Sequence, residues 1–206
     1  MIGISGEFGD PYCGSGASGY VNASQPKWKG HFQMFDYITQ ELPSLIESSF
    51  PIVDGKRKGI AGHSIGGHGA IMTALKKPGF YKSVSALSPP ASLMATPQGQ
   101  RAFSNYFGFN RKLWTEWDAL ELIRCYKGLP LDILIDQGSK DDLLKTMLHS
   151  WKLIESSVGT NISIDYRLQA GYDHSYERFV RMFIGDHIAY HAKLLENKVI
   201  KLDLSN

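Results

Sequence analysis

The sequence predicts an α/β fold with a mostly parallel sheet flanked by helices. Short apolar runs, typical of buried strands, alternate with stretches whose apolar residues recur at helical spacing. The run LDILID at residues 131–136 is apolar enough to be covered on both faces, as strands of parallel sheets are. Pro-Gly at residues 78–79 and Pro-Pro at residues 89–90 end the elements before them. The chain therefore shows the alternation that a parallel sheet requires.

The expected elements follow a glycine-rich, loop-like start over residues 1–27. Strands are expected at residues 58–61, 81–88, 131–136 and 162–168. Helices are expected at residues 32–50, after a sharp turn at residues 62–67 up to residue 77, at residues 143–157 and at residues 176–197, with short helical pieces between 91 and 130. Pro43 lies inside the first helix and should kink or shorten it, because proline cannot donate the helical hydrogen bond.

Composition and charge limit the class of protein and its partners. The chain has 206 residues, of which 43% are hydrophobic, and this composition is typical of one globular domain over residues 1–206. Its 22 basic and 20 acidic residues give a net charge of +2, which argues against nucleic acid or an anionic membrane as the main partner. No apolar run approaches the ~20 residues that a membrane span needs.

Cysteine usage and the first residues indicate a reducing compartment. Cys13 and Cys125 provide neither a disulfide framework nor the spacing of a zinc site. The start, MIGISGEFGD, lacks the basic and apolar regions of a signal peptide. We therefore expect a cytoplasmic protein.

Residues 62–66 read GHSIG and match G-x-S-x-G, a turn that presents a nucleophilic serine between a strand and a helix. A serine on such a turn adopts a strained backbone, and the glycines let the strand and the helix approach each other. The helix N-terminus favours negative charge beside the serine. Because a predicted strand precedes the motif and a predicted helix follows it, Ser64 is a candidate nucleophile. A plain glycine-rich turn is the alternative.

A carboxylate and a histidine follow Ser64 in the order that this motif requires. The loop after the strand at 131–136 contains Asp141 and Asp142, and the loop after the strand at 162–168 contains His174. Both loops begin at carboxyl ends of predicted strands, where open α/β sheets place their sites. We therefore expect His174 to be the base and an aspartate of the first loop to orient it.

Four further histidines are interpreted as structural. His187 and His191 are four residues apart on the last predicted helix and could share a metal ion. No third ligand is near in sequence, so a packed helix face is the favoured interpretation and no metal site is expected. His31 and His149 are interpreted as surface or packing residues.

Two histidines flank the candidate nucleophile. His63 and His68 lie on either side of Ser64. Since a base needs an acid of its own to orient it, we expect these side chains to orient the turn or to line the pocket rather than to act as the base.

Several segments resemble the S-formylglutathione hydrolases, also called esterase D. These segments are GHSIGGHGAIMTALKKPGFYKSVSALSP, LDILIDQG and GYDHSY, with GSGASGYVNAS and W-x-x-x-F-x-M-F-x-Y-I-T-x-E-L-P also recognisable. The similarity extends from about Gly14 to Lys193. It implies an α/β-hydrolase fold, no cofactor, and hydrolysis of the S-formylglutathione thioester to glutathione and formate, in formaldehyde catabolism. It also implies activity on small acyl esters.

The resemblance assigns roles to individual residues. The family's nucleophile corresponds to Ser64 and its histidine to His174. Its acid lies three residues past the glycine of the QG pair, which is Asp141 here. Asp142 is the alternative if Ser139 is an insertion, but Asp141 is preferred because it keeps the following two leucines in register.

The chain departs from the family in the part before Ser64. Only 63 residues precede this serine, and one segment among them reads as a strand, whereas an α/β hydrolase needs several strands there. The backbone N–H of Ile65 should be one oxyanion donor, but the strand and loop that supply the second donor are not found. The chain therefore resembles a member truncated at the N-terminus. Its first strand, at 58–61, should present an unpaired edge.

Three functions follow as alternatives. The first is a working thioester and carboxylester hydrolase that acts on a small-molecule substrate. The second is a catalytically impaired fragment that serves only as a binding or interaction module, because the oxyanion loop and several strands are missing. The third is an acyltransferase that uses the same serine with another acceptor, which nothing in the sequence favours. A homodimer is compatible with all three.

Overall fold

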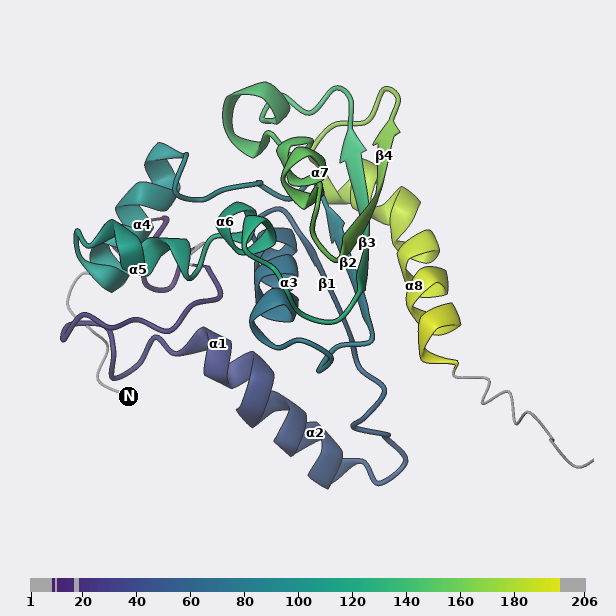
Figure 1. The fold of residues 1–206 in the computed structure, drawn as a ribbon, viewed down its shortest axis with the longest axis horizontal. Helices are drawn as coiled ribbons and strands as arrows, with labels where there is room; N and C mark the ends of the chain where they lie inside the picture. Colours follow the sequence, from purple (N-terminus) through teal and green to yellow (C-terminus); the bar gives the residue numbers. More distant parts are fainter. Residues whose placement is uncertain (1–8, 10, 17–18, 197–206) are drawn as a thin grey trace, which may run out of the picture.

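The computed structural model describes residue 9, residues 11–16 and residues 19–196. Its centre is a sheet of four parallel strands in the order β1-β2-β3-β4, which confirms the predicted α/β class (Figure 1). The strands are β1 (Gly59–His63), β2 (Ser83–Leu87), β3 (Leu131–Gly138) and β4 (Ile162–Gln169). Each strand lies within about two residues of its predicted position at either end.

Helices cover both faces of the sheet. On one face α3 packs against β1 and β2, α7 packs against β4, and α6 lies between these two helices, while α8 covers the opposite face (Figure 1). The described helical segments are α1 (Met34–Asp36), η1 (Tyr37–Glu41), α2 (Leu42–Ser49), α3 (Ile65–Lys76), α4 (Pro97–Phe107), α5 (Arg111–Thr115), α6 (Ala119–Arg124), η2 (Leu144–Leu148), α7 (Lys152–Ser157), η3 (Tyr176–Val180) and α8 (Arg181–Leu195), where η marks a π-helical turn. Among the residues described, no helix has both the length and the apolar character to cross a membrane.

The first helix is not shortened at Pro43. The chain stays helical from Met34 to Ser49, so the proline does not shorten the helix. It lies in the first turn of α2, directly after the π-helical turn η1. A π turn changes the hydrogen-bond spacing, so that the missing N–H of Pro43 falls where the pattern is already interrupted.

The prediction of one continuous helix at residues 143–157 is wrong. The segment is divided into η2 and α7, and His149 between them has the left-handed φ of 44°. The next residue, Ser150, is buried and donates a hydrogen bond to Gln137 in β3, while its hydroxyl also contacts that of Tyr166 in β4. These tertiary contacts fix the break, and helical periodicity does not encode them. The last predicted helix begins as the π turn η3, and its expected end at residue 197 lies outside the described residues.

The strand that leads to Ser64 lies at the edge of the sheet, as the sequence predicts. β1 pairs with β2 on one side, and no other described strand pairs with its outer side. Before β1, the described residues contain one isolated bridge, between Asn22 and Gln33. A free edge with exposed Gly59 and Ala61 leaves backbone groups without sheet partners.

A buried carboxylate joins α8 to the sheet. Asp136, in β3, is fully buried and accepts hydrogen bonds from Arg167 and Gln169 of β4, at 2.8 Å from Arg167 Nε and 2.8 Å from Gln169 Nε2. His187 of α8 adds a third partner, with its Nε2 at 3.0 Å. Burial by itself raises the pKa of Asp136, but the hydrogen bonds from His187, Arg167 and Gln169 together hold the pKa below its usual value. The carboxylate is therefore ionised in the folded protein.

Asp136→Ala should lower the free energy of unfolding by roughly 3 kcal/mol, because Arg167 loses its buried counter-charge and His187 loses its hydrogen-bond partner. Urea denaturation at neutral pH measures this loss. The loss should shrink as the pH falls below 3.8, the ordinary carboxyl value, since the ionised carboxylate then no longer stabilises the fold.

Asp186→Ala is the matched control for that substitution. Asp186 also faces Arg167, at 3.4 Å, but its side chain is exposed. Its removal should cost less than about 1 kcal/mol. Equal losses for the two variants would contradict the role given to Asp136.

Candidate active site

Ser64 lies on the tight turn between β1 and α3, with the left-handed backbone angle φ of 54°. The turn is possible because Gly62 has no side chain, since a Cβ there would lie 2.2 Å from the carbonyl oxygen of Gly66. Gly67 is also tight, with Ala86 and Pro89 of the β2 segment 3.1–3.2 Å from an added Cβ. Gly66, the second glycine of the motif, would meet only ordinary contacts. Close approach of the strand and the helix therefore depends on Gly62 and Gly67.

The structure brings Ser64, His174 and Asp141 together. His174 Nε2 lies 2.9 Å from Ser64 Oγ, and His174 Nδ1 lies 2.6 Å from Asp141 Oδ2. The aspartate comes from the loop after β3 and the histidine from the loop after β4, which are neighbouring strands. Asp142 is exposed, and no side-chain contact joins it to the described histidine. Of the two aspartates left open by the sequence, Asp141 is the one beside His174.

Hydrogen bonds hold the Asp141 carboxylate in position and keep it charged. Gln137 donates to its Oδ2 at 3.0 Å, and the backbone N–H of Leu143 donates to its Oδ1 at 3.0 Å. Burial raises the pKa of Asp141, but the hydrogen bond and charge of His174 and the two other donors outweigh burial and lower it. An ionised Asp141 makes Nδ1 of His174 the protonated nitrogen, which leaves Nε2 to accept the hydroxyl proton of Ser64.

Ile65 is the first residue of α3 and follows Ser64 directly. The first N–H groups of a helix have no acceptor within the helix, and they carry the positive end of its dipole. The backbone N–H of Ile65 therefore has no acceptor within α3. In the described residues before β1, no strand and loop offer a second donor of the expected kind.

His63 packs against the candidate base, and Tyr176 packs against His63. The His63 ring centroid is 4.6 Å from that of His174 and 4.5 Å from that of Tyr176. Burial, and secondly the nearby His174, lower the pKa of His63 to about 4, so its ring is neutral near pH 7. This agrees with the expectation that His63 orients the site rather than acts as its base. Sequence reasoning did not single out Tyr176, although the resembling segment GYDHSY ends on it.

The other histidines have partners within the fold. His68 is buried in α3, and its Nε2 accepts the N–H of Ala119 at 3.1 Å. His191 lies between two serine hydroxyls of β2, and His187 contacts Asp136, so the two do not converge on a shared ligand site. Within the described ranges, no group of three His, Cys, Asp or Glu side chains could hold a metal ion. His31 is exposed, and His149 lies in the break after η2.

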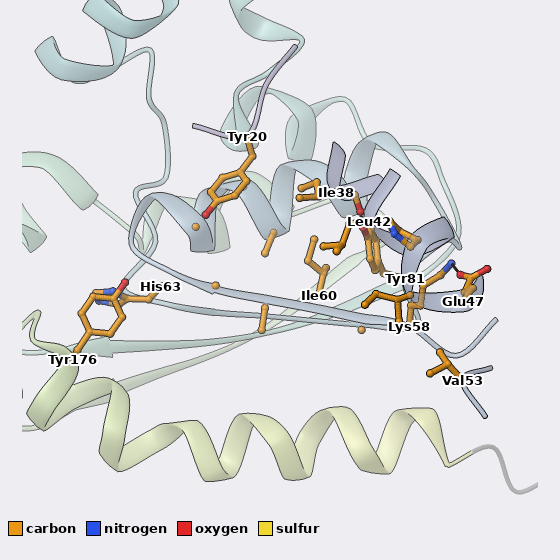
Figure 2. A pocket seen from close by; sticks show the side chains of 18 residues that line it. Tyr20, Ile38, Leu42, Glu47, Val53, Lys58, Ile60, His63, Tyr81 and Tyr176 are labelled. Carbon is orange, nitrogen blue, oxygen red and sulfur yellow. Dashed lines mark hydrogen bonds and ion pairs between the residues drawn. The ribbon is translucent and has the colours of Figure 1, made fainter. Parts of the chain in front are cut away.

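Two separate hollows adjoin the turn around Ser64, and they share no lining residue. The larger, about 490 Å³, is a groove along the outer side of β1, with His63 and Tyr176 at one end and Lys58 and Glu47 at the other (Figure 2). The smaller, about 130 Å³, is lined by Ser64 and Ile65. A carbonyl that reacts with Ser64 must contact it, so the smaller hollow is the candidate reaction pocket. We call the larger hollow the β1 groove.

Comparisons with known proteins identify the family of the chain. The chain matches the Esterase family (described as "Putative esterase") over residues 5–198. It is 46% identical to an S-formylglutathione hydrolase of Mus musculus and 45% identical to that of Bos taurus, over 193 residues in each case. These alignments cover 93% of this chain and 68% of each relative.

A solved structure is also similar. It is an S-formylglutathione hydrolase from Agrobacterium tumefaciens, with a TM-score of 0.81 and 39% sequence identity. The match covers 85% of this chain and 62% of that chain, so this chain spans about two thirds of its relatives' length. The chain belongs to the S-formylglutathione hydrolase family of esterases.

Proposed function

We propose that this chain hydrolyses the thioester of S-formylglutathione to glutathione and formate, and that it also cleaves small acyl esters. The observation that carries the proposal is the continuous contact from Asp141 through His174 to Ser64, at 2.6 and 2.9 Å. The relatives' activity and the strained serine turn support it. No metal or organic cofactor is needed for this chemistry.

Ser64 begins the reaction by attacking the thioester carbonyl. His174 Nε2 takes the hydroxyl proton as the Oγ–carbon bond forms, and Asp141 stabilises the resulting imidazolium. The carbonyl oxygen becomes negative and faces the N–H of Ile65. When the carbon–sulfur bond breaks, His174 returns its proton to the departing glutathione thiolate, which leaves a formyl ester on Ser64.

Water completes the cycle by the same route. His174 removes a proton from water while the water oxygen attacks the formyl-serine carbonyl. Collapse of the second tetrahedral intermediate breaks the Oγ–carbon bond, and the proton returns to Ser64 Oγ. Formate leaves, and the enzyme is ready for another substrate.

Asp141→Asn should lower kcat for p-nitrophenyl acetate by about 10⁴-fold, because an amide no longer selects the productive tautomer of His174. Asp142→Asn is the matched control and should leave kcat within about twofold, since Asp142 is exposed. Ser64→Ala sets the background rate. A wild-type rate equal to that background would refute the hydrolase proposal.

A second function is favoured by one observation, the open edge of β1. A chain that acts as an interaction module would use this edge, because its outer backbone groups have no described strand partner. We propose a second copy of this chain as the occupant, in a homodimer that pairs two β1 edges. The exposed apolar side chains of Ile46 and Val53 flank the β1 groove and would be covered in such a pair. We further propose the cytoplasm as the compartment and no nucleic-acid or membrane partner, on the charge and cysteine usage of the sequence.

Ala61→Lys should shift the chain from dimer to monomer, because an edge lysine opposes strand pairing through repulsion and desolvation. Light scattering coupled to gel filtration measures the mass. Val158→Lys is the control, since Val158 is 80% exposed and follows α7, which packs against β4 at the other edge of the sheet. A monomeric wild-type protein would exclude the dimer.

A further inference from the structure

The pocket beside Ser64 has one wall formed by a single face of α4. Gln98, Gly99, Ala102 and Phe103 follow the i, i+1, i+4, i+5 spacing that places side chains on one side of a helix. The wall is held close to the chain after β2, because a Cβ on Gly99 would lie 2.1 Å from the carbonyl oxygen of Leu93. Its position is therefore fixed by backbone contact.

The position of His174 determines which half of the substrate enters this pocket. The leaving thiolate must be within reach of His174, because that residue returns its proton. The pocket is lined by Ser64 and Ile65, and His174 is not among its described lining residues. The acyl half of the substrate must therefore occupy it.

The pocket is larger than a formyl group requires. It measures about 130 Å³, close to the roughly 150 Å³ of an apolar protein cavity that holds benzene. A chain of about three to five carbon atoms fits such a space. Most of the lining is apolar, with Pro90, Leu93, Ala102, Phe103 and Met147 among its members.

Gln98 adds an amide to this mostly apolar lining. Its Oε1 is buried and accepts no hydrogen bond from any described residue. Thr96 is another polar residue of the pocket lining. Its hydroxyl is satisfied, because it donates a hydrogen bond to the carbonyl of Leu93 and accepts one from the N–H of Gly99. A buried acceptor without a donor is unfavourable, and a hydroxyl on the bound acyl group would supply the donor.

We propose that the pocket is an acyl subsite selective for short acyl groups that carry a hydroxyl, and that Gln98 is its specificity-determining residue. The proposal rests on the proposed hydrolase function for the orientation of the acyl group. A site with a buried acceptor favours the substrate that donates to it, because the analogue without the hydroxyl leaves the acceptor unpaired.

Isosteric pairs of p-nitrophenyl esters test this selectivity. Hydroxyacetyl is compared with propanoyl, and 3-hydroxypropanoyl with butanoyl, and kcat/KM is measured for each. In Gln98→Leu the ratio of hydroxylated to plain substrate should fall roughly fivefold to tenfold in at least one pair, the value of one hydrogen bond. Comparing the ratio in Gln98→Leu with the ratio in the wild-type protein cancels the difference in intrinsic reactivity between the two esters.

Gln100→Leu is the matched control on the same helix. Gln100 does not line the pocket, and its amide donates to the carbonyl of Met94. It should leave the substrate ratio unchanged but lower Tm, whereas Gln98→Leu should not lower Tm, because it removes no described hydrogen bond. An unchanged ratio in Gln98→Leu, or an equal change in both variants, would overturn the proposal.

Binding without turnover separates this inference from the proposed function. In Ser64→Ala protein, calorimetry compares the glutathione thioesters of 3-hydroxypropanoate and butanoate. Tighter binding of the hydroxylated thioester, lost in Ser64→Ala/Gln98→Leu, supports the subsite even if wild-type protein shows no hydrolysis. If the protein hydrolyses the esters but shows no such preference in either assay, the hydrolase proposal stands and the proposal of an acyl subsite is overturned.

Discussion

The distance between β1 and α3 at Gly62 allows no Cβ, and the geometry around Ser64 depends on this close approach. A side chain at residue 62 would lie 2.2 Å from the Gly66 carbonyl oxygen, so any larger residue must push the helix away from the strand. The same approach holds Ser64 at a positive φ and makes Ile65, the next residue, the first of α3. Since the backbone fixes both the proposed nucleophile and the proposed oxyanion donor, the position of neither depends on a distant flexible side chain.

The rest of the site depends on parallel pairing in the sheet. β3 and β4 are paired from Leu131 opposite Ile162 to Gly138 opposite Gln169, so they end at the same edge. The loops that follow therefore start side by side, and the carboxylate of one meets the imidazole of the other at 2.6 Å. Any shift of this register would separate two residues that are 33 positions apart in the chain.

The positions of the strands along the chain, the serine turn and the two loop positions could be predicted because each has a local signal in the sequence. Apolar runs mark the strands, glycines mark the turn, and Asp141 and His174 follow strand ends. The break at His149 could not be predicted, because it depends on hydrogen bonds from Ser150 to side chains of β3 and β4. The packing of Tyr176 on His63 and the space for a Cβ at Gly66 are likewise set by distances between elements rather than by sequence spacing.

Among the described strands, β1, which leads to Ser64, is an edge strand, as β4 is on the other side of the sheet. Pairing on one side only, with small residues at Gly59, Ala61 and Gly62, leaves the amides of β1 less protected than those of β2 and β3, which are paired on both sides. Local opening of a protein begins where backbone hydrogen bonds are exposed and few side chains pack. Fraying of β1 would carry Ser64 away from His174. The contact between these two side chains therefore lasts only as long as β1 stays paired with β2.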